Sequence, residues 1–178
     1  MTVNVKKTPQ KTAINKVDLS DNDWRTTHLN SIKESYKKAA YYDEIIHEIE
    51  KIYFKDFVLL KDFNMATIEL LMDLLDVRIP WVYSSSLNPS GSKSELMANL
   101  SKSVGANYYL SGEGARDYFE PEPFDKANIK VMWQKFYHPE YTQIHGDFIP
   151  YLSSLDVLFN CGISGARKVL RSTNKNSG

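Results

Sequence analysis

The sequence predicts an α/β protein, and three observations lead to that class. Beyond residue 78, apolar segments of strand length alternate with amphipathic helical segments, which is typical of β-α-β units. The first two predicted strands run into loops rich in serine or glycine. The first half of the chain is mainly helical. We therefore expect three layers, with a mostly parallel sheet, flanking helices and a helical insertion in the first half.

The first half contains two short β-branched segments and three helical ones. Residues 2–5 and 14–19 fit short strands joined by a polar loop. A helix capped by Asp21 or Asn22 is expected to run to about Ala39. Further helices are expected over residues 42–53 and from about residue 65, because their apolar residues recur at helical spacing.

The second half supplies the predicted sheet. Residues 79–84, 106–110 and 129–136 are the three expected strands. Ser92 followed by Glu95 is a capping-box pattern that opens the helix after the first strand. Later in the chain, Pro150 suits the first position of a helix over residues 151–160, Gly162 ends it, and a basic helix covers residues 164–171.

Length and composition predict one domain over residues 1–178, with a frayed tail at residues 173–178. Lys plus Arg and Asp plus Glu number 22 each, so the net charge gives no attraction to nucleic acid. No apolar run is long enough for a transmembrane segment, and no secretory signal opens the chain. The single Cys161 excludes an internal disulfide. We expect a cytoplasmic protein.

Two loops follow predicted strands, and ligands of open parallel sheets bind outside the carboxyl ends of strands. In residues 84–93, hydroxyl groups, a helix N-terminus at Ser92 and the amine of Lys93 suit a phosphate or carboxylate. A polar connection with a good helix cap explains this loop equally well.

The second loop, residues 111–118, has the same dual interpretation. Its glycines allow a ligand to approach the backbone, and an arginine can bind an anion with two donors. A tight turn between strand and helix also needs glycine. The candidate binding residues here are Ser111, Gly112, Gly114 and Arg116.

The densest cluster of polar and aromatic residues lies between residues 133 and 151. His138 or His145 can act as a general acid or base near neutral pH, and Asp147 or Asp156 can orient the imidazole. Purely structural roles for these side chains are the alternative. The candidate substrate contacts in the same segment are Trp133, Tyr141 and Gln143.

The sequence lacks the motifs of several classes of catalytic and binding site. His138, His145, Asp147 and Cys161 offer metal-ligand types, but their spacing matches no familiar zinc site. No G-x-S-x-G nucleophile motif and no nucleotide-binding glycine fingerprint are present. We expect neither a metal nor a cofactor.

One long ordered pattern carries a family resemblance. It comprises Tyr109-Leu110-Ser111-Gly112, then Trp133, then the segment from His138-Pro139 through Gln143-x-His145-Gly146 and Leu155-Asp156 to Asn160-x-Gly162. This pattern resembles the C-terminal signature of WbqC-like proteins. Weaker agreement extends upstream through Ser90-Gly91-Ser92-Lys93 and Gly105-Ala106 to Lys6-Lys7 and Ile14-Asn15.

The resemblance implies a role in bacterial surface polysaccharide (O-antigen or lipopolysaccharide) biosynthesis. It implies a transferase that moves an amino-acid (glycine) or acyl group onto a nucleotide-linked or lipid-linked sugar precursor, and a complex with other enzymes of the pathway is compatible with it. Family members usually begin with an extra segment that holds a first strand, and this chain is expected to start after it. The alternatives are a non-catalytic module that binds a glycan precursor or a partner enzyme, and a truncated inactive remnant.

Overall fold

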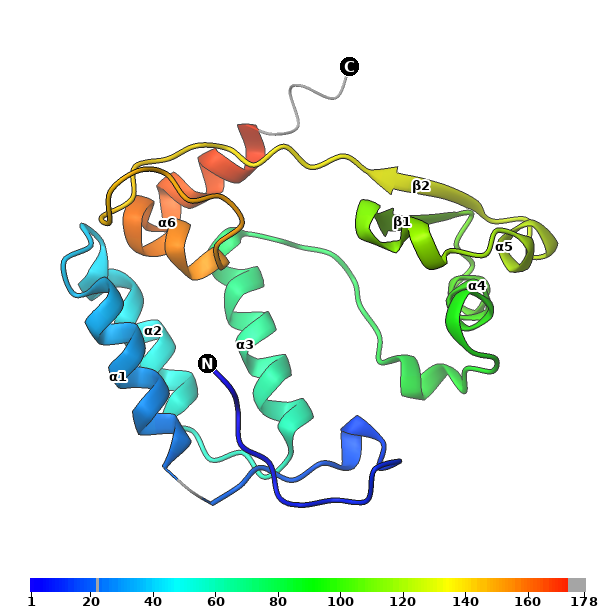
Figure 1. The fold of residues 1–178 in the computed structure, drawn as a ribbon, viewed down its shortest axis with the longest axis horizontal. Coiled ribbons are helices and arrows are strands. Elements are labelled where there is room, and N and C mark those ends of the chain that lie inside the picture. The colour runs from blue at the N-terminus through cyan, green and yellow to red at the C-terminus, as the bar shows by residue number, and fades with distance from the viewer. Residues whose placement is uncertain (22, 173–178) are drawn as a thin grey trace. The chain divides into compact units, whose positions relative to one another are not determined.

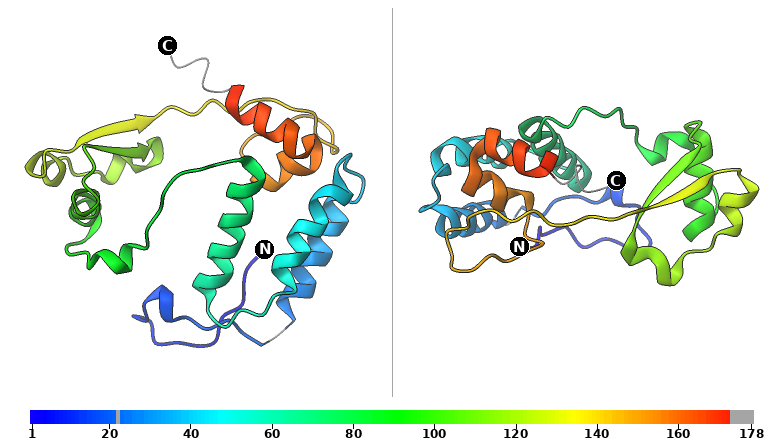
Figure 2. Two further views of the ribbon diagram at one scale, coloured as in Figure 1. Left: turned by 180° about the vertical axis from the view of Figure 1, so that it is seen from behind. Right: turned by 90° about the horizontal axis from the view of Figure 1, so that it is seen from above.

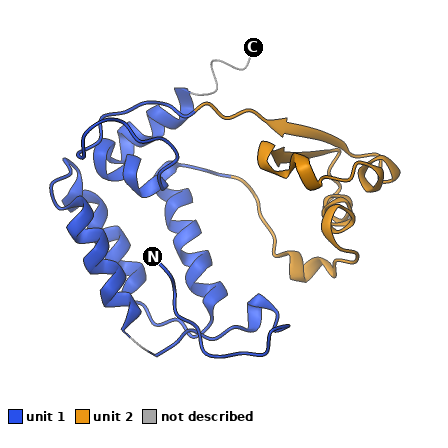
Figure 3. Cartoon of the chain, in the orientation of Figure 1, with its two compact units in different colours: residues 1–78, 138–178 blue, residues 79–137 orange. Residues whose placement is uncertain are grey.

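The computed structural model describes residues 1–21 and 23–172, and it contains two compact units (Figure 3). Unit 1 comprises residues 1–78 and 138–178, and unit 2 comprises residues 79–137. The α/β class is confirmed, with a helical unit 1 and a parallel sheet in unit 2 (Figure 1). The single domain over residues 1–178 stays a prediction, since compact units can still fold together. The expected tail at 173–178 and the candidate cap Asn22 lie outside the described residues.

Unit 1 is organised around its second helix. That helix packs against the other three, and its buried side chains Ile45, Ile46, Ile49 and Tyr53 recur at helical spacing. Burial of this apolar stripe stabilises the helix, as predicted for residues 42–53. The helices of unit 1 are α1 (Trp24–Tyr36), α2 (Tyr42–Tyr53), α3 (Leu60–Leu75) and α6 (Ser154–Ser172).

The two N-terminal strands predicted for unit 1 are wrong. Residues 2–5 and 14–19 form only isolated antiparallel bridges, Val5 with Leu19 and Asp18 with Leu59. A 3-10 turn, η1 (Ile14–Lys16), interrupts the second segment. β-Branched residues favour a strand only where a neighbouring strand offers a full ladder, and these segments form single bridges instead.

The C-terminal helix begins later than the sequence predicts. Pro150 does not open it, because Tyr151 adopts a left-handed conformation with φ of 62° and α6 starts at Ser154. The predicted interruption at Gly162 is confirmed, with φ of 68° and ψ of 173°, values that only glycine adopts readily. The basic segment then continues α6 to Ser172.

Unit 2 holds a two-stranded parallel sheet, β1 (Tyr108–Gly112) beside β2 (Lys130–Gln134) (Figures 1 and 2). Tyr108 pairs with Lys130 and Gly112 with Gln134, and Phe124 fills the small core beside the sheet. Both strands were predicted, with bounds shifted by one or two residues. The remaining elements are η2 (Ser84–Leu87), α4 (Lys93–Ser103), η3 (Glu113–Tyr118) and α5 (Glu122–Lys126).

The strand predicted at residues 79–84 is wrong. The segment pairs with no strand in the described chain, and Ile79, Trp81 and Val82 are exposed. Ser92 does stand at the N-cap of α4, but its side chain makes no capping hydrogen bond. No helix within residues 1–21 and 23–172 has the length and apolar character needed to cross a membrane.

Candidate functional site

A buried carboxyl group forms the centre of the candidate site in unit 1. Asp156, in the first turn of α6, is only 5% exposed. Its Oδ1 accepts a 3.0 Å hydrogen bond from the Tyr36 hydroxyl, and its Oδ2 accepts bonds from the Tyr141 hydroxyl at 2.9 Å and Gln143 Nε2 at 3.0 Å. A buried acid is tolerated only when such donors compensate for lost water. Three donors from two other segments do so here.

The electrostatics of this site keep the hydroxyl and thiol groups protonated. Burial, followed by the charge of Asp156, raises the pKa of Tyr36. Burial is also the largest cause that raises the pKa of Tyr141 to about 12, with Asp156 adding to it. Burial and Asp156 together raise the pKa of the Cys161 thiol. The tyrosines therefore act as hydrogen-bond donors, and the thiol is a poor nucleophile.

The loop that follows His138 is fixed to the helices by side chains. Gln143 bonds the backbone of Ile149 twice: its Oε1 accepts from the Ile149 N–H at 2.8 Å and its Nε2 donates to the Ile149 carbonyl at 3.0 Å. His145 Nε2 lies 2.9 Å from the carbonyl of Ser35 in α1. These contacts join the two ends of residues 143–149 to each other and the segment to α1.

His138 lies at the centre of an aromatic cluster. Its ring centroid is 5.5 Å from Phe148, 5.4 Å from Tyr151 and 6.2 Å from Tyr141. Its Nδ1 lies 3.0 Å from the carbonyl oxygen of Pro139, an acceptor, so the neutral ring carries its proton on Nδ1 and its basic lone pair on Nε2. Tyr141 contacts both His138 and Asp156 and so joins the aromatic cluster to the buried carboxyl group.

The structure joins one of the predicted catalytic residues to two of the predicted substrate contacts. Asp156 accepts its hydrogen bonds from Tyr36, Tyr141 and Gln143. The two histidines instead face backbone carbonyls, and Asp147 is exposed. The catalytic roles of His138, His145, Asp147 and Asp156 stay predictions. Within residues 1–21 and 23–172, no three His, Cys, Asp or Glu side chains gather as a metal site requires.

Sequence reasoning missed three members of the site. Tyr36 is not among the residues expected at the site, because nothing local in the sequence connects it to Asp156, 120 positions away. Phe148 and Tyr151 stand in the segment that was singled out, but a ring's burial and its neighbours depend on the loop conformation. The signal that pointed to them was the density of aromatic residues between 133 and 151.

In unit 2, Arg116 is engaged by its own neighbours. Its Nε and Nη2 donate to both carboxylate oxygens of Glu113, and its guanidinium carbon lies 4.3 Å from the Trp133 ring centroid. The hydrogen bond from Arg116 is the largest cause that lowers the pKa of Glu113. An anionic ligand at Arg116 would have to compete with this bidentate pair.

The other predicted binding residues of unit 2 are dispersed. Ser111 is buried within β1, and Gly112 ends that strand. Gly114 is exposed in η3, and Ser92 and Lys93 are exposed at the start of α4. Because residues 79–84 form no strand, the two loops do not leave neighbouring strand ends here. Binding by these residues stays a prediction.

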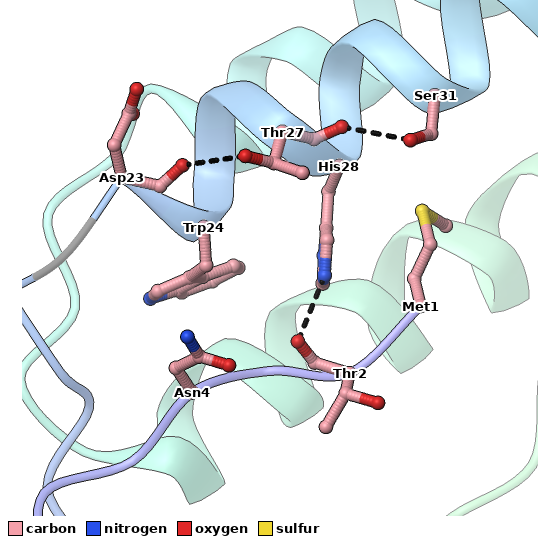
Figure 4. A pocket seen from close by; sticks show the side chains of 8 residues that line it. All are labelled: Met1, Thr2, Asn4, Asp23, Trp24, Thr27, His28 and Ser31. Carbon is pink, nitrogen blue, oxygen red and sulfur yellow. Dashed lines mark hydrogen bonds between the residues drawn. The ribbon is translucent and has the colours of Figure 1, made fainter.

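A separate open pocket of about 470 Å³ lies between the first residues of the chain and α1 (Figure 4). His28 Nε2 lies 3.0 Å from the Thr2 carbonyl, and the hydroxyls of Thr27 and Ser31 donate to carbonyls one turn earlier. These bonds engage the side chains of Thr27, His28 and Ser31 without a ligand. The pocket contains none of the predicted site residues; its lining is Met1, Thr2, Asn4, Asp23, Trp24, Thr27, His28 and Ser31.

Comparison with known proteins agrees with the pattern around this site. The model of the WbqC-like protein family matches residues 1–168. The chain belongs to this family. The WbqC-like chain is also 30% identical over 142 residues to the uncharacterized protein Rv1507c of Mycobacterium tuberculosis. That match covers 79% of this chain and 62% of the relative, so the chain spans less than two thirds of the relative's length. No solved structure matches the chain significantly.

Proposed function

We propose that this WbqC-like protein acts in the cytoplasm on a sugar precursor of bacterial surface polysaccharide, moving an amino-acyl (glycine) or acyl group onto it. Family membership supports the biological setting. One observation supports the chemistry: an imidazole, His138, contacts three aromatic rings, one of which is anchored to the buried Asp156. A titratable base in an aromatic environment, held by a rigid support, suits acid–base catalysis.

The proposed step is acyl transfer. An amine or hydroxyl of the sugar attacks the carbonyl carbon of an activated acyl donor, forming a C–N or C–O bond while the bond to the leaving group breaks. Nε2 of His138 takes the proton from the attacking group and returns it to the leaving group. The neutral tautomer with its proton on Nδ1 gives Nε2 the lone pair that a base requires.

Asp156 is a positioning residue in this proposal. Its carboxyl group fixes the Tyr141 hydroxyl and the Gln143 amide, and Tyr141 in turn contacts the His138 ring. His145, whose Nε2 faces the Ser35 carbonyl in an exposed position, is the second candidate base. Its contact with α1 suits a structural role as well.

A ligand screen followed by a product search tests the function. Ligands that bind only the native state raise the melting temperature, so we expect a shift with one UDP-, GDP- or dTDP-linked sugar. That sugar is then incubated with acyl-CoA donors or with activated glycine, and the acylated sugar is detected by mass spectrometry. We expect His138→Gln to abolish product and His145→Gln to retain it. Unchanged turnover in both variants would exclude both histidines as the base.

A non-catalytic binding module is the second candidate. One contact favours it: the Nε2 of His145, the second candidate base, is occupied by the Ser35 carbonyl. A module would bind the precursor with the same affinity in the presence and absence of every donor, and would release it chemically unchanged. Product formation at a rate that depends on His138 would reject this alternative.

A further inference from the structure

The aromatic cluster around His138 includes an exposed ring, that of Tyr151, which the proposed chemistry does not use. Tyr151 is 76% exposed, yet its ring is packed edge-on against His138 with a centroid distance of 5.4 Å. The Phe148 ring continues the same cluster, 5.5 Å from His138 and 5.3 Å from Tyr141. The result is an aromatic surface that reaches solvent and is connected through Tyr141 to the buried Asp156.

The backbone at Tyr151 is strained. Five described non-glycine residues have positive φ, and three of them are Asp or Asn, which tolerate this conformation. Tyr151, with φ of 62°, is the aromatic exception. A bulky residue in the left-handed region is unfavourable, and strain of this kind gathers at binding and catalytic sites. Glycine would adopt this conformation with less strain, so the backbone conformation does not explain a tyrosine there.

The charges of the loop restrict the ligand. Residues 138–153 contain two acids, Glu140 and Asp147, and no lysine or arginine. Asp147 is exposed and directly precedes Phe148. A phosphate or another anion is therefore disfavoured at this surface. A sugar ring fits, because its C–H face packs on aromatic rings while its hydroxyl or amino groups donate to a carboxylate.

We propose that Tyr151 and Phe148, with His138 between them, form a stacking surface for the pyranose ring of a neutral or amino sugar. This inference rests on the proposed function and makes it more specific, since it places the sugar ring, rather than the phosphates of a precursor, beside His138. Asp147 accepts hydrogen bonds from the sugar's hydroxyl or amino groups. The residue assigned a catalytic role from sequence therefore acts here in binding.

Saturation-transfer NMR with simple glycosides tests this stacking surface. The probes are methyl α-D-glucopyranoside and methyl 2-amino-2-deoxy-α-D-glucopyranoside, with uridine monophosphate as the anionic comparison. We expect saturation of the sugar ring protons with the glycosides. Tyr151→Gly should weaken binding about tenfold, the effect of losing one aromatic contact, and Tyr151→Phe should change it less than about threefold. Tyr118→Ala, which removes a similarly exposed tyrosine from unit 2, should leave binding unchanged.

Folding and catalysis are separated by two further readouts. Because Tyr151→Gly relieves a positive φ, its melting temperature should equal or exceed that of the natural chain, so lost binding is not lost folding. Unchanged glycoside binding in Tyr151→Gly, or binding of uridine monophosphate alone, would overturn the stacking surface. Glycoside binding without acyl transfer would reject the proposed transferase and support the stacking surface. Acyl transfer with an unchanged KM in Tyr151→Gly would support the transferase and reject the stacking surface.

Discussion

The hydroxyl of Tyr36 donates a 3.0 Å hydrogen bond to Oδ1 of Asp156, although 120 positions separate the two residues. The Tyr36 ring also stacks on Phe159 with a centroid distance of 4.4 Å and an interplanar angle of 9°. One tyrosine thus connects the end of α1 to α6 through both polar and apolar contacts. The second oxygen of Asp156 binds the loop through Tyr141 and Gln143, so this carboxyl group unites three segments of unit 1.

Asp156→Asn should destabilise the protein. An asparagine keeps the volume and one acceptor, but it loses the charge that strengthens three hydrogen bonds and introduces two N–H donors beside existing donors. We expect the free energy of unfolding, measured with urea, to fall by about 1 to 3 kcal/mol. The matched control is Asp147→Asn in the exposed part of the loop, which should change it by less than about 0.5 kcal/mol. Equal effects of the two variants would show that the Asp156 contacts contribute no stability.

The same contacts predict a loss of stability in alkaline solution. The pKa of Tyr141 rises from an ordinary value near 10 to about 12 in the folded protein. Between these values the unfolded chain loses the proton while the folded protein retains it, so the free energy of unfolding falls as pH rises. The contribution of Tyr141 is fully present below pH 10 and declines toward pH 12. Urea unfolding of the natural chain and Tyr141→Phe from pH 8 upward should show a shallower decline in the variant. Parallel declines would contradict the prediction.

Helices and paired strands were the predictable part of the fold. The helical spacing of its isoleucines was enough to locate α2, and the structure buries them on one face. The prediction of a strand at residues 79–84 was wrong. Ile79 and Val82 are residue types that favour strands, but the segment has no paired neighbour in the described chain. A strand requires a partner far away in sequence, and local composition does not specify that partner.

The connections within the candidate site could not be predicted from the sequence. The cluster of polar and aromatic residues after Trp133 includes Tyr141 and Gln143, and the structure joins both to Asp156. We expected an acid of this segment to orient a histidine, whereas the structure joins Asp156 to Tyr36. That contact depends on how α1 packs against its neighbours, and the sequence of residues 133–156 carries no information about this packing.

In unit 2, the carboxyl group of Glu113 should report whether Arg116 is available to a ligand. The hydrogen bond from Arg116 lowers the pKa of Glu113 below its ordinary value. Arg116→Gln should therefore return this pKa to the ordinary range, as measured by NMR titration of the side-chain carboxyl signal. Phosphate added to the natural chain should raise it in the same direction if phosphate displaces Glu113. A phosphate titration without any change, beside a clear effect of Arg116→Gln, would exclude Arg116 as an anion site.

Gly162→Ala should destabilise unit 1 through two separable effects. The backbone at residue 162, with φ of 68° and ψ of 173°, is unfavourable for any residue with a Cβ, at about 1 to 3 kcal/mol. The added Cβ would also lie only 2.6 Å from a ring carbon of Tyr41, an overlap that costs roughly a further 1 to 3 kcal/mol.

Urea unfolding of a double-mutant cycle separates these two effects. In the Tyr41→Ala background, the cost of Gly162→Ala should fall to the backbone contribution alone, because the clashing ring is absent. Gly114→Ala is the control, since a Cβ at that position would meet no heavy atom within 4 Å and its φ is not positive, and it should be tolerated. An undiminished cost in the Tyr41→Ala background would mean that the ring moves aside freely. The backbone conformation at Gly162, and not the close approach of Tyr41, would then be the reason for a glycine in the middle of α6.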